Sequence, residues 1–209
     1  MVSFAGLARW SLTTWLLIAG AIGIAIAVWS PYLRASRVAR IEGRACAVAE
    51  ALLAVAMEWP GDPLNADAEA VRAELHRRCR DLGHPDSSLV DASPLPRGVQ
   101  PPAFAFVSRH YVYLLARTPM ARYGDGGVER VGPLEVLAWP SSFLVGGRTA
   151  FFFAADAKPA FTRNLVASYE GTSRAPRPGF ARRRANSSLP EATWYRGEDD
   201  ERWLELPTP

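Results

Sequence analysis

Leu16–Trp29 reads LLIAGAIGIAIAVW and is apolar throughout. No charged residue stands between Arg9 and Arg34. A helix over residues 10–31 is long enough to cross the ~30 Å hydrocarbon core of a bilayer. Aromatic residues at positions 10, 15, 29 and 32 flank the stretch, as is typical of anchors at the membrane interface. The sequence therefore predicts a transmembrane helix over 10–31, preceded by a short tail over 1–9.

A cleaved secretory signal is the alternative interpretation of this stretch. The apolar run is longer than that of a typical signal. A retained anchor is therefore favoured. Arg34, Arg37 and Arg40 follow the span and could reach lipid headgroups, while the excess of arginine on this side favours a cytoplasmic C-terminal domain.

A helical segment is predicted over 32–83. Its first part carries an apolar stripe at alternating spacings of three and four residues, formed by Val38, Ile41, Ala45, Val48, Leu52, Val55 and Trp59. The sequence PGDP after Trp59 should end this helix. Asn65 or Asp67 can then cap a second helix, which Gly83 should end.

Residues 84–102 are rich in proline, serine and aspartate and are predicted to form a linker. An antiparallel sheet is expected over 103–170, with glycine-containing turns at 123–127 and 146–147. Residues 171–209, basic and then acidic, are expected to be irregular surface chain. The predicted fold class is α+β: a transmembrane helix extended into a long amphipathic helix, packed on a four-stranded sheet. The predicted strands are Phe104–Arg117, Gly132–Trp139, Arg148–Ala155 and Phe161–Tyr169.

Few residues offer chemistry. None of the three histidines lies in a nucleophile, metalloprotease or phosphate-loop motif, so no catalytic residue is predicted and the chain is not expected to be an enzyme. Cys46 and Cys79 are a candidate disulfide between neighbouring helices, with two buried free thiols as the alternative. The arginines of 174–184 lack interleaved aromatics over most of the segment, so no nucleic-acid partner is expected.

The most concentrated acidic group is Glu198, Asp199, Asp200 and Glu201. Hard carboxylate oxygens of this kind can hold calcium. The alternative interpretation is a solvated turn without a ligand. No other cofactor is expected. Within the span, Ala19, Gly23 and Ala27 repeat every four residues, so that another membrane helix could approach closely.

Two motifs resemble those of type IV pilins and type II secretion pseudopilins. Pro31–Arg37 reads PYLRASR, similar to the Pro-x-Leu-x-x-Ser-Arg segment that follows the apolar stretch in that family. Ala138–Pro140 (AWP), Gly146–Gly147 and Arg148–Phe153 (RTAFFF) are similar to the strand, turn and strand of some pilin-like domains. The resemblance implies one long N-terminal helix packed on a small antiparallel sheet. Some pseudopilins also hold calcium in a C-terminal loop.

The N-terminus departs from that family. The resemblance aligns Arg9 with the glycine before the usual cleavage site and Thr14 with the glutamate that aids filament assembly. A relative that keeps its anchor therefore fits better than a major filament subunit. The resemblance implies a single-pass protein of the bacterial inner membrane with its domain in the periplasm, against the arginine count.

These observations predict a membrane-anchored, pilin-like structural or interaction protein, a minor component of an envelope assembly or secretion apparatus. Its expected partners are the membrane and other pilin-like or secretion-apparatus proteins, reached through helix packing. One alternative is a membrane-tethered enzyme or ligand-binding domain with a pocket formed by the loop Arg122–Arg130 and the acidic turn. The other is a cytoplasmic-facing adaptor.

Overall fold

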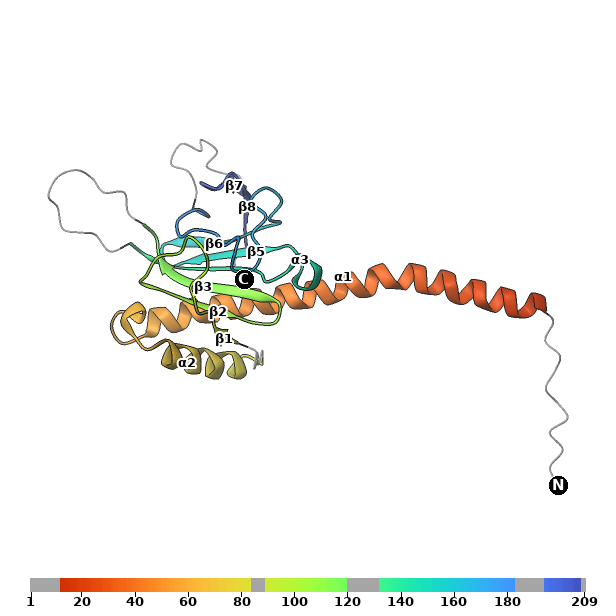
Figure 1. Cartoon of the computed structure of the whole chain (residues 1–209), viewed down its shortest axis with the longest axis horizontal. Helices are drawn as coiled ribbons and strands as arrows, with labels where there is room; N and C mark the ends of the chain where they lie inside the picture. The colour runs from red at the N-terminus through yellow and green to blue at the C-terminus, as the bar shows by residue number, and fades with distance from the viewer. Residues whose placement is uncertain (1–11, 84–88, 120–131, 183–193, 208–209) are drawn as a thin grey trace, which may run out of the picture. The chain divides into compact units, whose positions relative to one another are not determined.

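The computed structural model describes residues 12–83, 89–119, 132–182 and 194–207, in two compact units that divide after residue 39. The predicted tail 1–9, the turn 123–127 and the loop Arg122–Arg130 lie outside the described residues. The helices are α1 (Leu12–Glu58), the 3-10 turn η1 (Pro63–Asn65), α2 (Ala68–Asp81) and α3 (Phe143–Gly146) (Figure 1). The strands are β1 (Val90–Asp91), β2 (Ala103–Val107), β3 (Tyr111–Arg117), β4 (Leu134–Pro140), β5 (Ala150–Ala154), β6 (Ala157–Thr162), β7 (Trp194–Arg196) and β8 (Arg202–Glu205).

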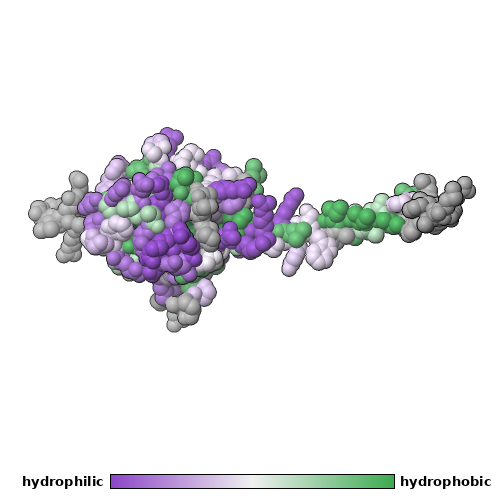
Figure 2. All heavy atoms as spheres, turned by 90° about the horizontal axis from the view of Figure 1, so that it is seen from below, coloured by the Kyte–Doolittle hydropathy of each residue, from purple (hydrophilic) through white to green (hydrophobic). Residues whose placement is uncertain are grey.

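The first unit consists of the apolar part of α1. Its large side chains are exposed, with Leu17 at 75% and Ile24 at 68%. Judged by length and composition alone, α1 could cross a membrane. None of the residues in its most apolar stretch is buried. Figure 2 shows hydrophobic side chains along much of this part. Pro31 lies inside α1 and removes one backbone donor, yet the helix continues through it.

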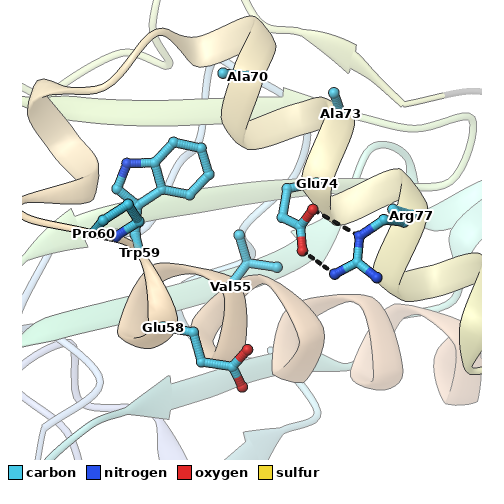
Figure 3. Close-up of a pocket in the computed structure, with 8 residues that line it drawn as sticks. All are labelled: Val55, Glu58, Trp59, Pro60, Ala70, Ala73, Glu74 and Arg77. Carbon is cyan, nitrogen blue, oxygen red and sulfur yellow. Dashed lines mark hydrogen bonds and ion pairs between the residues drawn. The ribbon is translucent and has the colours of Figure 1, made fainter.

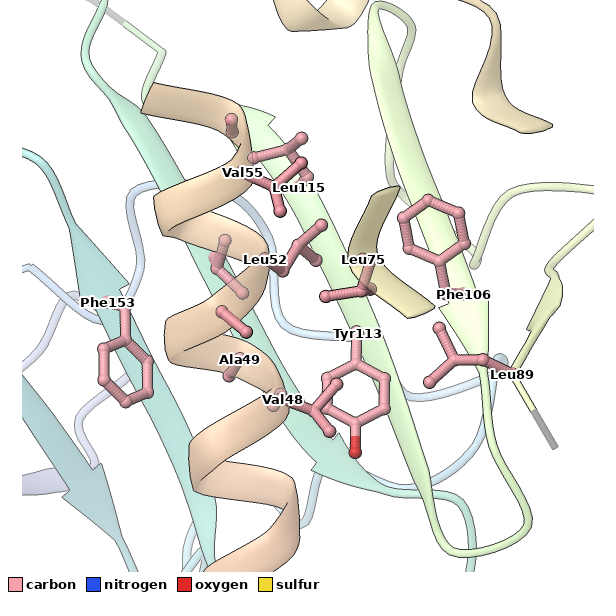
Figure 4. Packing of buried hydrophobic residues seen from close by; sticks show 14 of the residues in the cluster. Val48, Ala49, Leu52, Val55, Leu75, Leu89, Phe106, Tyr113, Leu115 and Phe153 are labelled. Carbon is pink, nitrogen blue, oxygen red and sulfur yellow. The ribbon is translucent and has the colours of Figure 1, made fainter. Parts of the chain in front are cut away.

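The predicted stripe of α1 is confirmed in the second unit, which begins at Arg40. Ala45, Val48, Leu52 and Val55 are buried, and they pack against one face of the sheet (Figure 4). The sheet contributes side chains from alternate positions of its strands, because neighbouring residues in a strand point to opposite faces. These are Phe106, Tyr113, Leu115, Val136 and Phe153.

Helix α1 ends, and helix α2 begins, where the local sequence predicts. α1 ends at Glu58, just before Trp59 and the PGDP turn. Asp67 caps α2, since its side chain accepts a hydrogen bond from the Glu69 backbone N–H, whereas Asn65 lies in η1. Leu75 of α2 extends the same core toward Phe106.

The sheet has eight strands rather than the four predicted. All neighbours are antiparallel, in the order β1-β2-β3-β4-β5-β6-β8-β7. The predicted strand Phe104–Arg117 is a hairpin, because Ser108 turns the chain: its Oγ accepts a hydrogen bond from Tyr111 N–H at 3.1 Å. The sheet also gains β1 within the predicted linker, and β7 and β8 within the region predicted to be irregular.

The second face of the sheet is also covered, so β4 is buried along its whole length. Leu137 and Trp139 of β4 belong to this second core, together with Phe152, Tyr195 and Trp203. Segment 163–182 lies against it, and the Trp139 indole N–H donates to the Gly171 carbonyl at 2.7 Å. The predicted strand Phe161–Tyr169 ends at Thr162, because the buried Asn164 side chain binds the Tyr169 backbone and closes a loop.

We expect Leu52→Ala to lower the free energy of unfolding of the full chain by about 2 to 5 kcal/mol, because it opens a cavity between α1 and the sheet. Denaturant unfolding in detergent, followed by circular dichroism, measures this change. Met57→Ala is the matched control, since Met57 of the same helix is 56% exposed and its truncation should cost less than about 1 kcal/mol. Equal losses for the two variants would contradict the packing of the stripe.

Candidate functional site

The predicted packing residues of the span lie on the described part of α1. Ala19, Gly23 and Ala27 are all exposed. A Cβ atom built on Gly23 would meet nothing within 4 Å, so a neighbouring helix could approach its backbone closely.

Three arginines follow the span on the same helix, and all are exposed. These are Arg34, Arg37 and Arg40. Arg34 and Arg37 line a shallow surface with Ile26, Trp29 and Leu33. The aliphatic part of an arginine side chain can lie beside apolar residues while its guanidinium group reaches polar surroundings. Such an arrangement suits the boundary between the acyl chains and the phosphates of a lipid layer.

The candidate disulfide is not formed, since Cys46 and Cys79 are free thiols. Cys79 is buried and Cys46 is half-buried, and both pack in the core between the helices and the sheet. Burial is the main cause that raises the pKa of Cys46 to about 11, and Glu50 adds to it. Both residues therefore act as small apolar groups in this structure.

The acidic turn does not assemble its four carboxylates as one ligand set. Glu201 is buried and accepts hydrogen bonds from the backbone N–H groups of Val166 (2.5 Å) and Ala167 (2.6 Å) and from the Thr162 hydroxyl (3.0 Å). Within the described residues, no group of three or more metal-ligating side chains comes together.

Asp199 is the second acidic residue of this turn that binds within the domain. It accepts hydrogen bonds from the Tyr169 hydroxyl at 2.5 Å and from the Glu201 N–H at 3.0 Å. Burial raises the pKa of Asp199, against these donors, which lower it. Glu198 and Asp200 are exposed. Two of the four predicted calcium ligands, Asp199 and Glu201, thus accept hydrogen bonds from groups of the domain itself.

Glu135 on β4 forms a buried polar network that the sequence analysis missed. Its carboxylate, 1% exposed, accepts hydrogen bonds from Thr118 Oγ1 (2.5 Å), the Gly179 N–H (2.6 Å) and Arg182 Nε (3.3 Å). Arg182 also binds Asp156 at 2.8 and 3.0 Å. The network therefore holds segment 163–182 on the second face of the sheet. One sequence signal was present: Glu135 shares a strand face with Leu137 and Trp139, where a charge must find a partner.

The helical side of the domain carries an open groove with a volume of about 640 Å³ (Figure 3). Val55, Trp59, Ala70 and Ala73 contribute its apolar lining. Its charged residues are paired, Glu74 with Arg77 and Glu58 with Arg78. The groove offers an apolar surface between two helices, without a nucleophile and base together among the residues that line it.

We expect Glu135 to make a contribution to the stability of the protein that declines as pH rises above about 4.3, the ordinary pKa of glutamate. Burial, the largest effect, raises the pKa of Glu135, so the folded state holds this proton more tightly than the unfolded state and loses stability as the group ionises. Glu135→Gln should therefore flatten this decline, measured by denaturant unfolding between about pH 4 and pH 7.

Glu74→Gln is the control for Glu135→Gln, since Glu74 lies outside the Glu135 network. The hydrogen bond from Arg77 lowers the pKa of Glu74, so this group is already ionised in both states across most of that window. The variant should keep the wild-type slope. A Glu135→Gln variant with the same slope as the wild type would show that the Glu135 pKa is not raised.

Comparison with known proteins adds no assignment. No family model matches the chain, and neither the curated proteins nor the solved structures include a significant match. Function must therefore be inferred from the residues of this chain and their chemistry.

Proposed function

We propose that this chain is a single-pass, membrane-anchored structural or interaction protein of the pilin-like kind. It would act as a minor component of an envelope assembly or secretion apparatus in a bacterial inner membrane. Its domain would lie in the periplasm and contact other components, while its span packs against their membrane helices.

One observation carries this proposal. The single helix α1 has an exposed apolar part over the predicted span, and its later residues form the buried stripe of the domain. Exposing large residues such as Leu17 and Ile24 to water is unfavourable, by about 25 cal/mol per Å² of apolar surface. A bilayer removes that cost and keeps every backbone group of the helix hydrogen-bonded.

The architecture supports the pilin-like part of the proposal at a coarse level. A long N-terminal helix that packs on an antiparallel sheet is what the resemblance implies, although the sheet here is larger than expected. The interaction role is supported by the exposed Ala19, Gly23 and Ala27 surface and by the apolar groove between α1 and α2. Orientation follows from the resemblance alone.

We expect wild-type protein to stay in the membrane pellet after alkaline carbonate extraction, and its domain to be protease-sensitive in spheroplasts. Ile22→Arg combined with Ile26→Arg should release much of the chain, because each arginine costs about 2.5 to 3.5 kcal/mol at the centre of a span. Ala39→Arg is the control, with one added arginine outside the predicted span. Extraction of the wild type would refute the anchor, and a protease-resistant domain would refute the periplasmic orientation.

The helix-packing role predicts that bulk on the small-residue surface blocks association. Gly23→Leu should reduce cross-linking between the span and its partner helices in native membranes by roughly fivefold, equivalent to a loss of about 1 kcal/mol of packing. Ala21→Leu adds bulk on the other side of the helix and should leave cross-linking unchanged. Equal cross-linking for Gly23→Leu and the wild type would argue against this surface.

A further inference from the structure

The antiparallel strand order brings four connections to the same end of the sheet, here named the rim. The rim consists of residues 108–110, 141–149, 163–171 and 197–201. Helix α1 meets the sheet at this end. Its Glu42 carboxylate accepts a hydrogen bond from the Thr149 hydroxyl at 2.7 Å and pairs with Arg163 at 3.5 Å. The rim is thus the end of the domain where the N-terminal helix enters it.

The rim carries the most exposed large apolar side chains among the described residues of the domain. Leu144 is 96% exposed, Leu165 67% and Val166 65%. Their backbones are held in place, since the Glu170 carboxylate accepts the Phe143 N–H and Glu201 accepts the Val166 N–H. The two loops are also joined, because the Gly171 N–H donates to the Pro140 carbonyl at 3.0 Å. Several large apolar side chains held out at one end of a domain are typical of an interaction surface.

Arginines lie beside these apolar residues. Arg109, Arg148 and Arg163 of the rim are exposed, and the Arg148 guanidinium lies over the Phe143 ring at 5.7 Å. Arg40 and Arg44 of α1 are exposed as well.

The acidic groups of the rim offset part of this charge. Glu42 pairs with Arg163 at 3.5 Å, and Glu170, Asp199 and Glu201 are bound to donors of the rim loops. The exposed acids of the described rim are Glu198 and Asp200, in the β7–β8 turn at the edge of the sheet, whereas Arg109 and Arg148 lie in the β2–β3 and β4–β5 connections. Apolar side chains flanked by arginines match the chemistry of an anionic lipid surface, with acyl chains beneath phosphates.

The chain itself keeps this end of the domain near a bilayer if the span is inserted. Tyr32, at the end of the apolar stretch, is ten residues before Glu42. Ten residues span at most about 35 Å even when fully extended. Such a short connection makes the effective concentration of lipid at the rim high.

We propose that the rim is a second membrane contact, in which Leu144, Leu165 and Val166 enter the lipid interface while Arg109 and Arg148 bind lipid phosphates. The inference depends on the proposed anchor. It adds that the domain lies against the bilayer and presents its other end to partners.

Nitroxide labels on the full chain test this contact in vesicles of phosphatidylcholine with about one-third phosphatidylglycerol. Labels at Leu144→Cys, Met57→Cys and Ile24→Cys, each in a Cys46→Ser, Cys79→Ala background, report the rim, the opposite end of the domain and the span. The Leu144 label should collide with lipid-soluble oxygen more than with a water-soluble nickel chelate, and the Met57 label should do the reverse. Hydrogen exchange on the unsubstituted chain should show slower exchange at 141–149 and 163–171 in vesicles than in detergent.

The three labels separate the two proposals. A lipid-exposed Ile24 label with a water-exposed Leu144 label would overturn the rim contact and leave the anchor, and the rim would then be free for a protein partner. A water-exposed Ile24 label would overturn the anchor itself, and the rim contact with it. Unchanged exchange of the rim segments would also overturn the contact, without relying on any substitution.

The charge on the rim has its own test. Arg148→Gln should lower the lipid-contacting population roughly fivefold, which corresponds to about 1 kcal/mol for one basic side chain at an anionic membrane. Lys158→Gln, exposed at the opposite end of the sheet, is the matched control and should have no effect. Equal effects of the two substitutions would show that contact with lipid does not involve the rim arginines.

Discussion

The packing of the buried α1 stripe, from Ala45 to Val55, on the aromatic face of the sheet is the contact on which the rest of the domain depends. It removes a continuous row of apolar side chains from water and gives the central strands β3, β4 and β5 a cover on one side. It also sets the direction in which α1 crosses the sheet, with Glu42 at the rim and Val55 beside Leu115. The residues of α1 that follow the predicted span most closely therefore meet the sheet at the rim.

The second face of the sheet imposes a different constraint. Because Glu135 is buried there among apolar side chains, its carboxylate is tolerated only while Thr118, Gly179 and Arg182 supply hydrogen bonds. Glu201 plays the same part for the loop at Val166. A few buried carboxylates therefore hold the irregular segment 163–182 in one arrangement. The rim loop 163–171 is fixed in the same way, by hydrogen bonds to Glu201.

How much of this could be predicted from the sequence depends on the range of the interactions. The end of α1 at Glu58 and the cap of α2 follow from local chemistry, and Asp67 is one of the two caps that the sequence predicted. The strand count was wrong for two reasons. The predicted strand Phe104–Arg117 is a hairpin of two strands, and β1, β7 and β8 are short segments that are stabilised by their neighbours rather than by their own alternation. The roles of Asp199 and Glu201 could not be predicted from local patterns, because the donors Tyr169 and Val166 lie 30 and 35 residues away along the chain.

The sequence by itself determined the long apolar stretch, the α1 stripe and the α+β class, because hydrophobic periodicity and capping depend on residues only a few positions apart. The tertiary structure alone decided that the sheet has eight strands, that the acidic turn binds its own domain, and that Leu144, Leu165 and three arginines share one end of the sheet. The physical reason is that burial and strand pairing join residues far apart in the chain, and no local pattern carries that information.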